Sequence, residues 1–585
     1  MTRAVLVVSR DPKAPNSLDS YADVLNRNLA ADNIDPRPPT VIQRSGVTAA
    51  VLNPSATSRT QGASIAIGTL LDPIGDWHAP GAPLPDGSFA LLRADDTHVE
   101  LVADGVGSRT LWYAVTDYEL IASTSQRAIV TLLGSFEPNR DVLPWMLSAG
   151  TLGPLDGWDA RVKRVQPGER VLLDRSRWRV KSTVEQPSPS PEPDLSHDAH
   201  RERLRSTVSD ACRRWSFDAR KWILTLSGGA DSRSLLCLLR DRGIETVTWG
   251  LPHSDEKDGN DAQVAREVAR IVGVPHRFIA IEAGAVSDPE VVLRRFLALG
   301  EGRVDRISGY VDGFGVWKTL FEEGFDGVIR GDHAFGSELV RSAYAVRSKT
   351  SLTTLADYFG ASEIESFEFP EQRMPEALTR APAETGAAWR DRLFRMSRIP
   401  TFLAALTDLK TPYVDVGNPL LARSVLDCVR ALPDELRTGK RLWRELVRAQ
   451  LPEVAIARRV AIPSVTDFLK ERRVLQLLLD ELASDRAASI FTPTLRARCR
   501  EALVGVLNTK RSMRRTDWGE TWLGRAVPAH VRAVVGDWRS KRPEMEPLVL
   551  AFRVFVASRM QAVLGADAAT RPAEHAAPAL AWGSR

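Results

Sequence analysis

The stretch from residue 227 to residue 232 reads Ser-Gly-Gly-Ala-Asp-Ser and combines residue types that can hold a polyphosphate. Two adjacent glycines let the backbone approach an anion closely. The hydroxyls of Ser227 and Ser232 can donate hydrogen bonds to phosphate oxygens, and Asp231 can hold the magnesium ion that bridges the phosphates. We therefore predict a site for ATP and Mg²⁺ without a Walker lysine, with these nucleotide-binding residues: Leu226, Ser227, Gly228, Gly229, Asp231 and Ser232.

The elements around this stretch are suited to position it. Residues 221–226 predict a strand, and residues 232–240 predict a helix with three leucines on one face. A helix that begins directly after the loop offers its free N–H groups and the positive end of its dipole to phosphate oxygens. A plain glycine-rich turn with Asp and Ser as helix caps would look similar. The full six-residue pattern between a strand and a helix favours the phosphate loop.

The same six residues resemble the pyrophosphate loop of the asparagine-synthetase-like enzymes, which split ATP between the α and β phosphates. The resemblance covers nearly the whole chain, because other landmarks of that family follow in the same order. The segment at 246–250 resembles the strand that flanks the adenine, which implies a nucleotide contact at Trp249. The remaining matches are Asp261 and Ala265 in an Asp-x-x-x-Ala helix start, the loop at 331–336, the segment at 411–415 and the segment at 440–444.

The resemblance also implies roles for individual residues. Asp332 falls at the family's second metal ligand, beside the nucleotide contact Gly331, so that Asp231 and Asp332 would share the Mg²⁺. Lys440 falls where the family has a lysine beside the α-phosphate, and its fixed charge would stabilise the adenylation step. Spacing alone would equally fit a surface lysine and an ordinary loop aspartate. We predict Lys440, Asp332 and His333 as catalytic residues.

Four further residues give less specific signals of function. His333 and Glu338 are candidate proton acceptors, although a loop histidine beside a metal carboxylate is more often a hydrogen-bonding neighbour. Asp261 is predicted as a helix cap rather than as a ligand contact. Trp443 departs from the family's Lys-x-x-Leu-Arg pattern.

Residues 1–185 are strand-rich and resemble the family's class II glutamine amidotransferase domain, an α+β sandwich of the Ntn-hydrolase type. The segments at 87–90 and 104–107 fall where core strands and a turn of that domain are expected. Its chemistry is missing, because Thr2 replaces the nucleophilic cysteine and no cysteine occurs before Cys212. Residues 68–70 read Gly-Thr-Leu in place of the Asn-Gly-Glu that holds glutamine. We therefore predict a degenerate domain without glutaminase activity.

Composition changes divide the chain. Alternating proline and small polar residues at 187–194 predict an extended linker. Beyond it, apolar runs alternate with helical stretches, which predicts an α/β domain with a parallel sheet. The resemblance implies the adenine nucleotide α-hydrolase type of this fold. We predict a degenerate amidotransferase-like domain at 1–185, a linker at 186–196, an ATP-pyrophosphatase domain at 197–564 and a flexible tail at 565–585.

The overall composition is that of a folded, soluble protein, with 43% apolar and 26% charged residues among 585. The net charge of +4 comes from dispersed arginines, without a basic tail that would indicate nucleic-acid binding. No run of eighteen apolar residues and no signal-peptide pattern is present, so we expect neither a membrane span nor export. Four widely spaced cysteines fit a reducing cytoplasm. They are Cys212, Cys237, Cys428 and Cys499.

Without a source of ammonia, the attacking amine must come from elsewhere, most simply from the substrate itself. Two branches of the family form amides intramolecularly. They are the β-lactam synthetases and the lasso peptide cyclases, macrolactam synthetases that join a peptide's N-terminal amine to an Asp or Glu side chain. The loop before Asp332 is short, and Arg233 follows the phosphate loop, as in the cyclases. A peptide amine with a pKa of about 7.7 to 8.0 also needs little help from a base.

The predicted reaction is therefore adenylation of a side-chain carboxylate followed by attack of the N-terminal amine, which gives an isopeptide bond, AMP and pyrophosphate. The resemblance implies a precursor peptide as substrate, with a leader-binding protein and a leader protease as partners. A small-molecule amide or β-lactam synthetase is the alternative enzyme. A nucleotide-binding scaffold that has lost catalysis is the alternative from a different class, although such a scaffold would need none of Asp231, Asp332 and Lys440.

Overall fold

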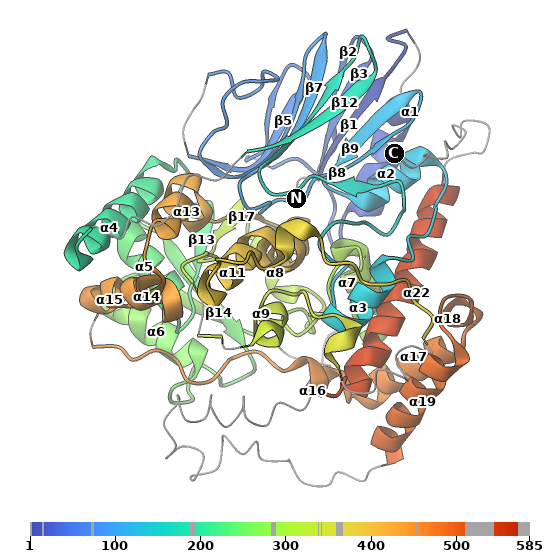
Figure 1. Cartoon of the computed structure of the whole chain (residues 1–585). Helices are drawn as coiled ribbons and strands as arrows, with labels where there is room; N and C mark the ends of the chain where they lie inside the picture. Colours follow the sequence, from blue (N-terminus) through green and yellow to red (C-terminus); the bar gives the residue numbers. More distant parts are fainter. Residues whose placement is uncertain are drawn as a thin grey trace.

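The computed structural model describes residues 3–13, 17–55, 57–71, 75–185, 195–281, 288–336, 339–340, 342–358, 367–451, 453–508 and 543–570. These residues form two halves, a β-sandwich from the first 185 residues and a larger α/β unit that follows (Figure 1). Residues 186–194 of the predicted linker, residues 571–585 of the predicted tail and Glu338 lie outside the described residues.

The N-terminal half is a sandwich of two antiparallel six-stranded sheets, ordered β10-β8-β9-β1-β3-β2 and β12-β11-β7-β6-β5-β4. Side chains alternate along β1, because Ala4, Leu6 and Val8 pack between the sheets, whereas Val5 and Val7 pack against helices α1 and α2. The predicted α+β architecture is confirmed. Its elements are β1 (Arg3–Ser9), α1 (Ser17–Leu29), β2 (Thr40–Arg44), β3 (Val47–Leu52), β4 (Arg59–Gln61), β5 (Ser64–Leu70), β6 (Gly87–Ala94), β7 (His98–Ala103), β8 (Trp112–Val115), β9 (Glu119–Ser123), α2 (Gln126–Leu133), α3 (Val142–Ala149), β10 (Lys163–Arg164), β11 (Glu169–Asp174) and β12 (Arg179–Val184).

The second half is built on a five-stranded parallel sheet with the order β15-β14-β13-β16-β17. Helices cover both faces, because Leu224 of β13 packs into a cluster with α4, α5 and α6, whereas Ile223 packs into a cluster with α7 and α8. The predicted parallel α/β domain is confirmed. Its first elements are α4 (His197–Arg214), β13 (Trp222–Thr225), α5 (Ala230–Leu239), β14 (Glu245–Gly250), α6 (Asp261–Val272), β15 (His276–Ala280), α7 (Pro289–Gly300), α8 (Gly315–Glu322), β16 (Gly327–Ile329), α9 (Ala343–Lys349) and β17 (Asp415–Gly417).

The rest of this half is mostly helical. One long helical stretch continues from α11 through η4, a π-helical segment with Pro400 inside it, into α12. The remaining helices are α11 (Gly386–Leu393), η4 (Phe394–Leu403), α12 (Ala404–Asp408), α13 (Arg423–Arg430), α14 (Asp434–Arg437), α15 (Arg441–Gln450), α16 (Val465–Leu469), α17 (Arg472–Ala483), α18 (Asp485–Ile490), α19 (Pro493–Asn508) and α22 (Pro547–Ala569). Short 3-10 turns are η1 (Arg240–Arg242), η2 (Leu355–Asp357), η3 (Glu376–Leu378), η5 (Pro419–Leu421) and η6 (Thr438–Lys440).

Helix α22 runs along one side of the molecule beside α3 and α7 (Figure 1). Within the described residues it is the one helix long and apolar enough to cross a membrane, which the search for an unbroken apolar run did not anticipate. However, 61% of its apolar window is buried inside the protein, where it packs against α2, α17 and α19. It is therefore a core helix. It continues to Ala569, past residue 565, where the flexible tail was predicted to begin.

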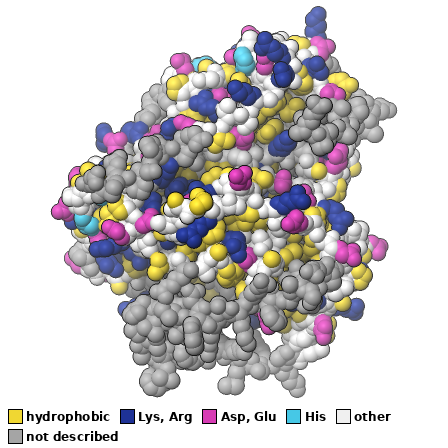
Figure 2. Space-filling model, viewed as in Figure 1, with side chains coloured by type: hydrophobic (Ala, Val, Ile, Leu, Met, Phe, Trp, Pro, Cys, Tyr) yellow, Lys and Arg dark blue, Asp and Glu magenta, His cyan; other side chains and the backbone are white. Residues whose placement is uncertain are grey.

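Buried ion pairs and a common core join the two halves. Arg109 Nη2 lies 2.9 Å from Asp415 Oδ1, and Arg127 Nε lies 2.7 Å from Asp567 Oδ2. The largest hydrophobic cluster includes Trp158 from the first half and residues of α7, α17 and α22 from the second. On the face shown in Figure 2, basic and acidic side chains are interspersed, in keeping with the dispersed charge of the sequence.

Candidate active site

A cavity of about 340 Å³ opens at the carboxyl ends of β13, β14 and β16. The chain order reverses here, because β14 lies on one side of β13 and β16 on the other. Ligands of open α/β sheets bind at such a switch point. The residues that line the cavity are Thr225, Leu226, Ser227, Asp231, Ser232, Thr248, Trp249, Asp261, Arg330, Gly331, Asp332, Val460, Ala461 and Ile462.

The loop at 227–232 is held in shape by its own hydroxyls. Ser232 Oγ accepts a hydrogen bond from the Ser227 N–H at 3.0 Å, and the two serine hydroxyls lie 3.0 Å apart. The Gly229 N–H donates to Ser227 Oγ at 3.3 Å. Helix α5 begins directly after the two glycines, so its first-turn N–H groups lie at the loop. The predicted order of strand, turn and helix is confirmed.

Asp261 supports this loop from the neighbouring helix α6. Its Oδ1 accepts a hydrogen bond from the Gly228 N–H at 2.8 Å, and its side chain lines the cavity. Burial raises the pKa of Asp261, and the bond from Gly228 opposes that change. The cap of α6 is Asn260, whose side chain accepts from the Ala262 N–H. The prediction that Asp261 caps the helix was wrong, because its carboxylate is turned to the glycine loop instead.

Residues 453–462, which we name the cover segment, lie along the glycine loop. The Ala457 N–H donates to the Gly228 carbonyl at 3.1 Å. Arg233 donates to the carbonyls of Val454 and Ala455 at 2.6 and 3.0 Å, and it does not line the cavity. A Cβ at Gly228 would lie against the Ala457 Cβ, well inside contact distance. Glycine is therefore needed at 228 for the close approach of the cover segment.

The Asp231 carboxylate is the centre of a polar cluster. Its Oδ2 lies 2.8 Å from Lys440 Nζ and 3.2 Å from His333 Nε2, and its Oδ1 accepts a hydrogen bond from Trp443 Nε1 at 2.9 Å. Lys440 Nζ also lies 2.6 Å from His333 Nε2. The Phe335 ring stacks on both His333 and Trp443. The fold thus brings together three predicted site residues that lie far apart in the chain.

The charges around Asp231 keep its carboxyl group ionised. Burial alone raises the pKa of this carboxyl, but His333 and Lys440 lower it by more, so the pKa falls well below its usual value. Lys440 itself has a left-handed backbone, with φ of 56°. A positive φ is uncommon for a residue other than glycine, and such strained positions cluster at functional sites.

Asp332 follows β16 and is paired with Arg330, whose Nε lies 3.1 Å from Asp332 Oδ2. Burial raises the pKa of Asp332, but the Arg330 charge outweighs it and the pKa falls below its usual value. Gly331 lies between them and packs closely on the phosphate loop, because a Cβ there would lie 3.0 Å from the Cβ of Asp231. The carboxylates of Asp231 and Asp332 therefore both lie at one cavity.

His333 and Lys440 line a second cavity of about 210 Å³, together with Ala334, Gly336, Asp391 and Phe394. Asp231, which contacts both His333 and Lys440, lines the first cavity. The cluster of these three side chains therefore stands between the two cavities. A fixed cation in this position can act on groups held on either side.

The donor set fits a magnesium ion that is bound together with a nucleotide. Within the described ranges, no group of three or more His, Cys, Asp or Glu side chains could hold a metal by itself. Mg²⁺ is usually bound by one or two carboxylates together with substrate phosphates rather than by a cage of protein ligands. Asp231 and Asp332 would supply those carboxylates, and both have lowered pKa values that keep them ionised.

The predicted site residues fall into three places. The first cavity is lined by Leu226, Ser227, Asp231, Ser232, Trp249, Gly331 and Asp332. Gly228 and Gly229 form the adjoining turn, and His333 and Lys440 line the second cavity. Asp415 of the matched segment at 411–415 pairs with Arg109 at the contact between the halves.

Sequence reasoning missed three contributors to the site. Arg330 pairs with Asp332. The only signal for it in the sequence was its position at the end of a strand, two residues before Asp332. Trp443 was noted only as a departure from a pattern, yet its indole N–H bonds Asp231. The cover segment carried no motif, and its place became visible only through contacts with Gly228 and Arg233.

In the N-terminal half, residues 68–70 border a separate cavity of about 190 Å³ that also contacts Arg59, Trp215 and Asp218. Thr2, which stands where the nucleophile was expected, lies outside the described residues. The absence of glutaminase chemistry stays a prediction from the sequence.

Comparison with known proteins places this site in a family. The asparagine synthase family matches residues 203–308, which contain the phosphate loop and β14. These residues are similar to that family. The predicted asparagine-synthetase-like resemblance is therefore confirmed for this part of the chain.

Two further proteins are similar to parts of the chain. The 7-cyano-7-deazaguanine synthase of Rhodopirellula baltica is 28% identical over 92 residues, which are 16% of this chain and 37% of that relative. The chain thus spans only about a third of that relative's length. The glutamine phosphoribosylpyrophosphate amidotransferase of B. subtilis, solved with ADP and GMP, aligns with 48% of this chain and 91% of its own, at 9% identity and a TM-score of 0.21. That score is too low for a correspondence of folds, so the amidotransferase assignment of the sandwich stays a prediction.

Proposed function

We propose that this chain is an ATP-dependent lasso peptide cyclase, which adenylates an Asp or Glu side chain of a peptide and joins it to the peptide's N-terminal amine. The observation that supports this proposal best is the position of the Asp231–His333–Lys440 cluster between two cavities. One cavity lies at the phosphate loop, and the other can receive an acyl substrate. A ligase that transfers AMP from ATP to a carboxylate, with release of pyrophosphate, must hold the nucleotide and the acyl substrate side by side.

The first step is binding of ATP at the carboxyl ends of the strands. The phosphates lie against the loop at 227–232, where N–H groups and the hydroxyls of Ser227 and Ser232 can donate hydrogen bonds. The base and ribose lie toward Trp249 and the cover segment. Asp231 and Asp332 would hold Mg²⁺, which when bound neutralises phosphate charge.

The chemical steps follow from the position of Lys440. The substrate carboxylate enters from the second cavity and attacks the α-phosphorus, and pyrophosphate leaves. Lys440 Nζ stabilises the negative charge that develops at the α-phosphate. The amine then attacks the acyl-adenylate, its proton is lost, AMP leaves and the amide forms. His333 lies 2.6 Å from Lys440 Nζ and holds it in place, as a hydrogen-bonding neighbour would.

The proposal that an amine of the substrate itself is the nucleophile rests on the first half of the chain. Its sequence lacks the cysteine that would release ammonia from glutamine. A peptide amine is partly neutral near pH 7, and holding both peptide ends together supplies much of the rate acceleration. The proposal includes a precursor peptide as substrate, a leader-binding protein and a leader protease as partners, and action in the cytoplasm.

A small-molecule amide or β-lactam synthetase is the second candidate. The modest size of the second cavity, about 210 Å³, supports it, because a cavity of that size suits a small acyl group.

The proposal is tested by incubating the purified full-length chain with ATP, Mg²⁺ and leaderless candidate core peptides. We expect a peptide product that has lost one water, with AMP and pyrophosphate released in equal amounts. Asp231→Ala is expected to abolish both product and AMP. AMP formed only with a small carboxylate and an amine would favour the second candidate. Bound but uncleaved ATP with every substrate would contradict both.

A further inference from the structure

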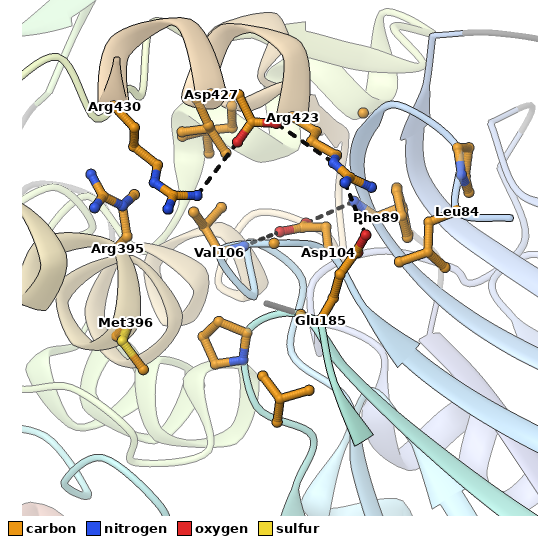
Figure 3. A pocket seen from close by; sticks show the side chains of 18 of the residues that line it. Leu84, Phe89, Asp104, Val106, Glu185, Arg395, Met396, Arg423, Asp427 and Arg430 are labelled. Carbon is orange, nitrogen blue, oxygen red and sulfur yellow. Dashed lines mark hydrogen bonds and ion pairs between the residues drawn. The ribbon is translucent and has the colours of Figure 1, made fainter. Parts of the chain in front are cut away.

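A fourth cavity, of about 190 Å³, lies between the β-sandwich and the helices of the second half (Figure 3). One wall comes from the sandwich, with Phe89 of β6 and the turn that carries Val106. The other wall comes from η4 and α13, with Met396 and Leu426. None of its lining residues also lines either cavity of the candidate active site. The steps proposed above make no use of it.

The walls of this cavity are mostly apolar, but four arginines line it: Arg392, Arg395, Arg423 and Arg430. Three of them have acidic partners. Arg423 Nη2 lies 2.9 Å from Glu185 Oε1, and Arg392 Nη2 lies 2.7 Å from Glu384 Oε2. Arg430 Nη1 lies 3.5 Å from Asp427 Oδ1.

Arg395 differs from the other three. Within the part of the chain that the structure describes, its guanidinium forms no hydrogen bond and no ion pair. Burial and the neighbouring Arg430 charge lower the pKa of Arg395 to about 10, although the Asp391 charge opposes them, so the group is still charged at neutral pH. Figure 3 shows the two guanidinium groups side by side at one end of the cavity. A largely buried cation that has no ion pair of its own and lies beside a second cation is costly.

The acidic side chains near Arg395 interact with other groups. Asp104 accepts hydrogen bonds from the N–H groups of Phe89 and Val106, as Figure 3 shows. Asp391 lies one helical turn before Arg395, lines the second cavity, and forms its ion pairs with Arg390 and Arg437. The Asp391 charge favours the charged form of Arg395, but no described carboxylate forms an ion pair with it, and an anion from outside could.

The helix that carries Arg395 also reaches the candidate active site. Asp391 and Phe394 line the second cavity beside Lys440, whereas Arg395 and Met396, the next two residues of the helix, line the fourth. The change from α-helix to π-helix falls at Phe394, and such π-helical segments are frequent at functional sites. A ligand long enough to follow this helix could contact both cavities.

We propose that the cavity between the two halves binds a carboxylate-bearing, otherwise apolar segment of the peptide substrate, with the carboxylate paired to Arg395 and Arg430. This inference rests on the proposed peptide substrate and extends it, since it assigns a second contact region remote from the reacting carboxylate. The apolar side chains of the segment lie against Phe89, Val106 and Leu426.

The test uses two fluorescent probes on the full-length chain without ATP, namely dansyl-Gly-Phe-Leu-Phe as the free acid and as the C-terminal amide. The wild type is expected to bind the acid at least tenfold more tightly than the amide, because hydrogen bonds to charged groups are strong. Arg395→Met and Arg430→Met, which keep an apolar stem, are expected to bring the two affinities together. Arg240→Met, at an exposed arginine that follows α5, is expected to keep the difference.

A second readout separates binding from a structural role. Removal of an unbalanced buried charge should raise the thermal unfolding midpoint of the ligand-free Arg395→Met chain, whereas loss of a structural contact would lower it. Equal binding of acid and amide by the wild type, or a preserved difference in both arginine variants, would overturn the proposal. ATP affinity is measured in parallel to show that each variant is folded. Because no turnover is needed, this result is independent of whether macrolactam formation is observed.

Discussion

The Asp231 side chain takes part in three interactions at once, with Lys440, His333 and Trp443. Such a carboxylate is fixed in both position and charge, which suits a group that must hold Mg²⁺ against a nucleotide. The contribution of each neighbour can be separated, because Lys440 brings a charge and Trp443 brings a neutral N–H.

Trp443→Phe removes the indole N–H but keeps an aromatic ring against Phe335. We expect kcat for AMP formation to fall roughly tenfold, since a hydrogen bond to a charged group contributes about 1.5 to 3 kcal/mol. The matched control is Trp178→Phe, which removes an indole N–H that donates to Thr116 O in the sandwich and should leave kcat unchanged. Equal rates in the wild type and Trp443→Phe would show that this N–H does not position Asp231.

Lys440→Met should lower kcat by about 10² to 10³, the range found when one group that stabilises developing charge is removed. The KM for ATP should change much less, because the lysine acts mainly on charge that develops during the reaction. Steady-state assays of pyrophosphate release measure both constants. Lys221→Met removes an exposed lysine ahead of β13 and serves as the control. A rise in KM with an unchanged kcat would contradict the proposed role.

The sequence was sufficient to predict which residues gather at the candidate site but not how they contact one another. Asp231 and Lys440 were each found from a local pattern, whereas their 2.8 Å contact spans 209 positions of the chain. The prediction that Asp261 caps its helix was wrong, because the hydrogen bond that it accepts from Gly228 depends on how α6 lies beside the loop. Pairings across the fold are set by tertiary packing, which a single sequence does not reveal.

At the scale of elements, the phosphate loop and the cover segment fit closely at Gly228. Gly228→Ala should push the cover segment away, because the new methyl group would meet the Ala457 Cβ. We expect ATP affinity, measured by isothermal titration calorimetry, to fall about tenfold or more. Gly229→Ala is the matched control in the same turn, since its Cβ would meet only Ser227 Oγ, at 3.3 Å. Similar losses in both variants would show that the cover segment is not the cause.

His276 opens β15 at the edge of the parallel sheet, where its Nδ1 lies 2.9 Å from Thr246 Oγ1. Burial lowers the pKa of His276 to about 4, and its value in an unfolded chain is about 6.5. Between these values the unfolded chain binds more protons than the folded one. The free energy of unfolding should therefore fall as the pH falls from about 6.5 toward 4, with no contribution above that window.

This dependence is tested with His276→Gln, which cannot take up a proton. We expect the urea midpoint to fall less between pH 7 and pH 5 in this variant than in the wild type. His253→Gln, at a side chain that is 74% exposed, should behave as the wild type does. An equal fall in His276→Gln and the wild type would exclude His276 as the source.

Periodicity was a good guide to the sheet and a poor guide to α22. Strand and helix alternation predicted the parallel order because burial on both faces makes such strands continuously apolar. A test for eighteen consecutive apolar residues does not find helix α22, because Arg553 and Arg559 interrupt its apolar residues. Both arginines form ion pairs with acidic side chains within the fold.

At the scale of the whole molecule, Arg127 of α2 and Asp567 of α22 form a buried ion pair. Burial lowers the pKa of Arg127, but Asp567 raises it by more, which indicates a favourable pair. Asp567→Asn should lower stability by about 3 to 5 kcal/mol, because it leaves a buried guanidinium without its partner charge. Chemical unfolding at pH 7 measures the loss.

Glu202→Gln provides the comparison at an exposed pair, where Arg205 Nη2 lies 2.6 Å from Glu202 Oε1. Water and salt screen an exposed ion pair, so little change in stability is expected. A loss in Asp567→Asn as small as that in Glu202→Gln would show that water reaches the α2–α22 contact.

The α2–α22 contact joins helices that the ribosome makes far apart in time. The ribosome makes Arg127 440 residues before Asp567, so the sandwich emerges while one side of α2 still lacks its covering helix. Early in translation, that apolar side is available to chaperones or to misassembly. The nascent chain can close its shared core only after α22 has left the exit tunnel, so the final packing of the sandwich on the second half waits for this one helix.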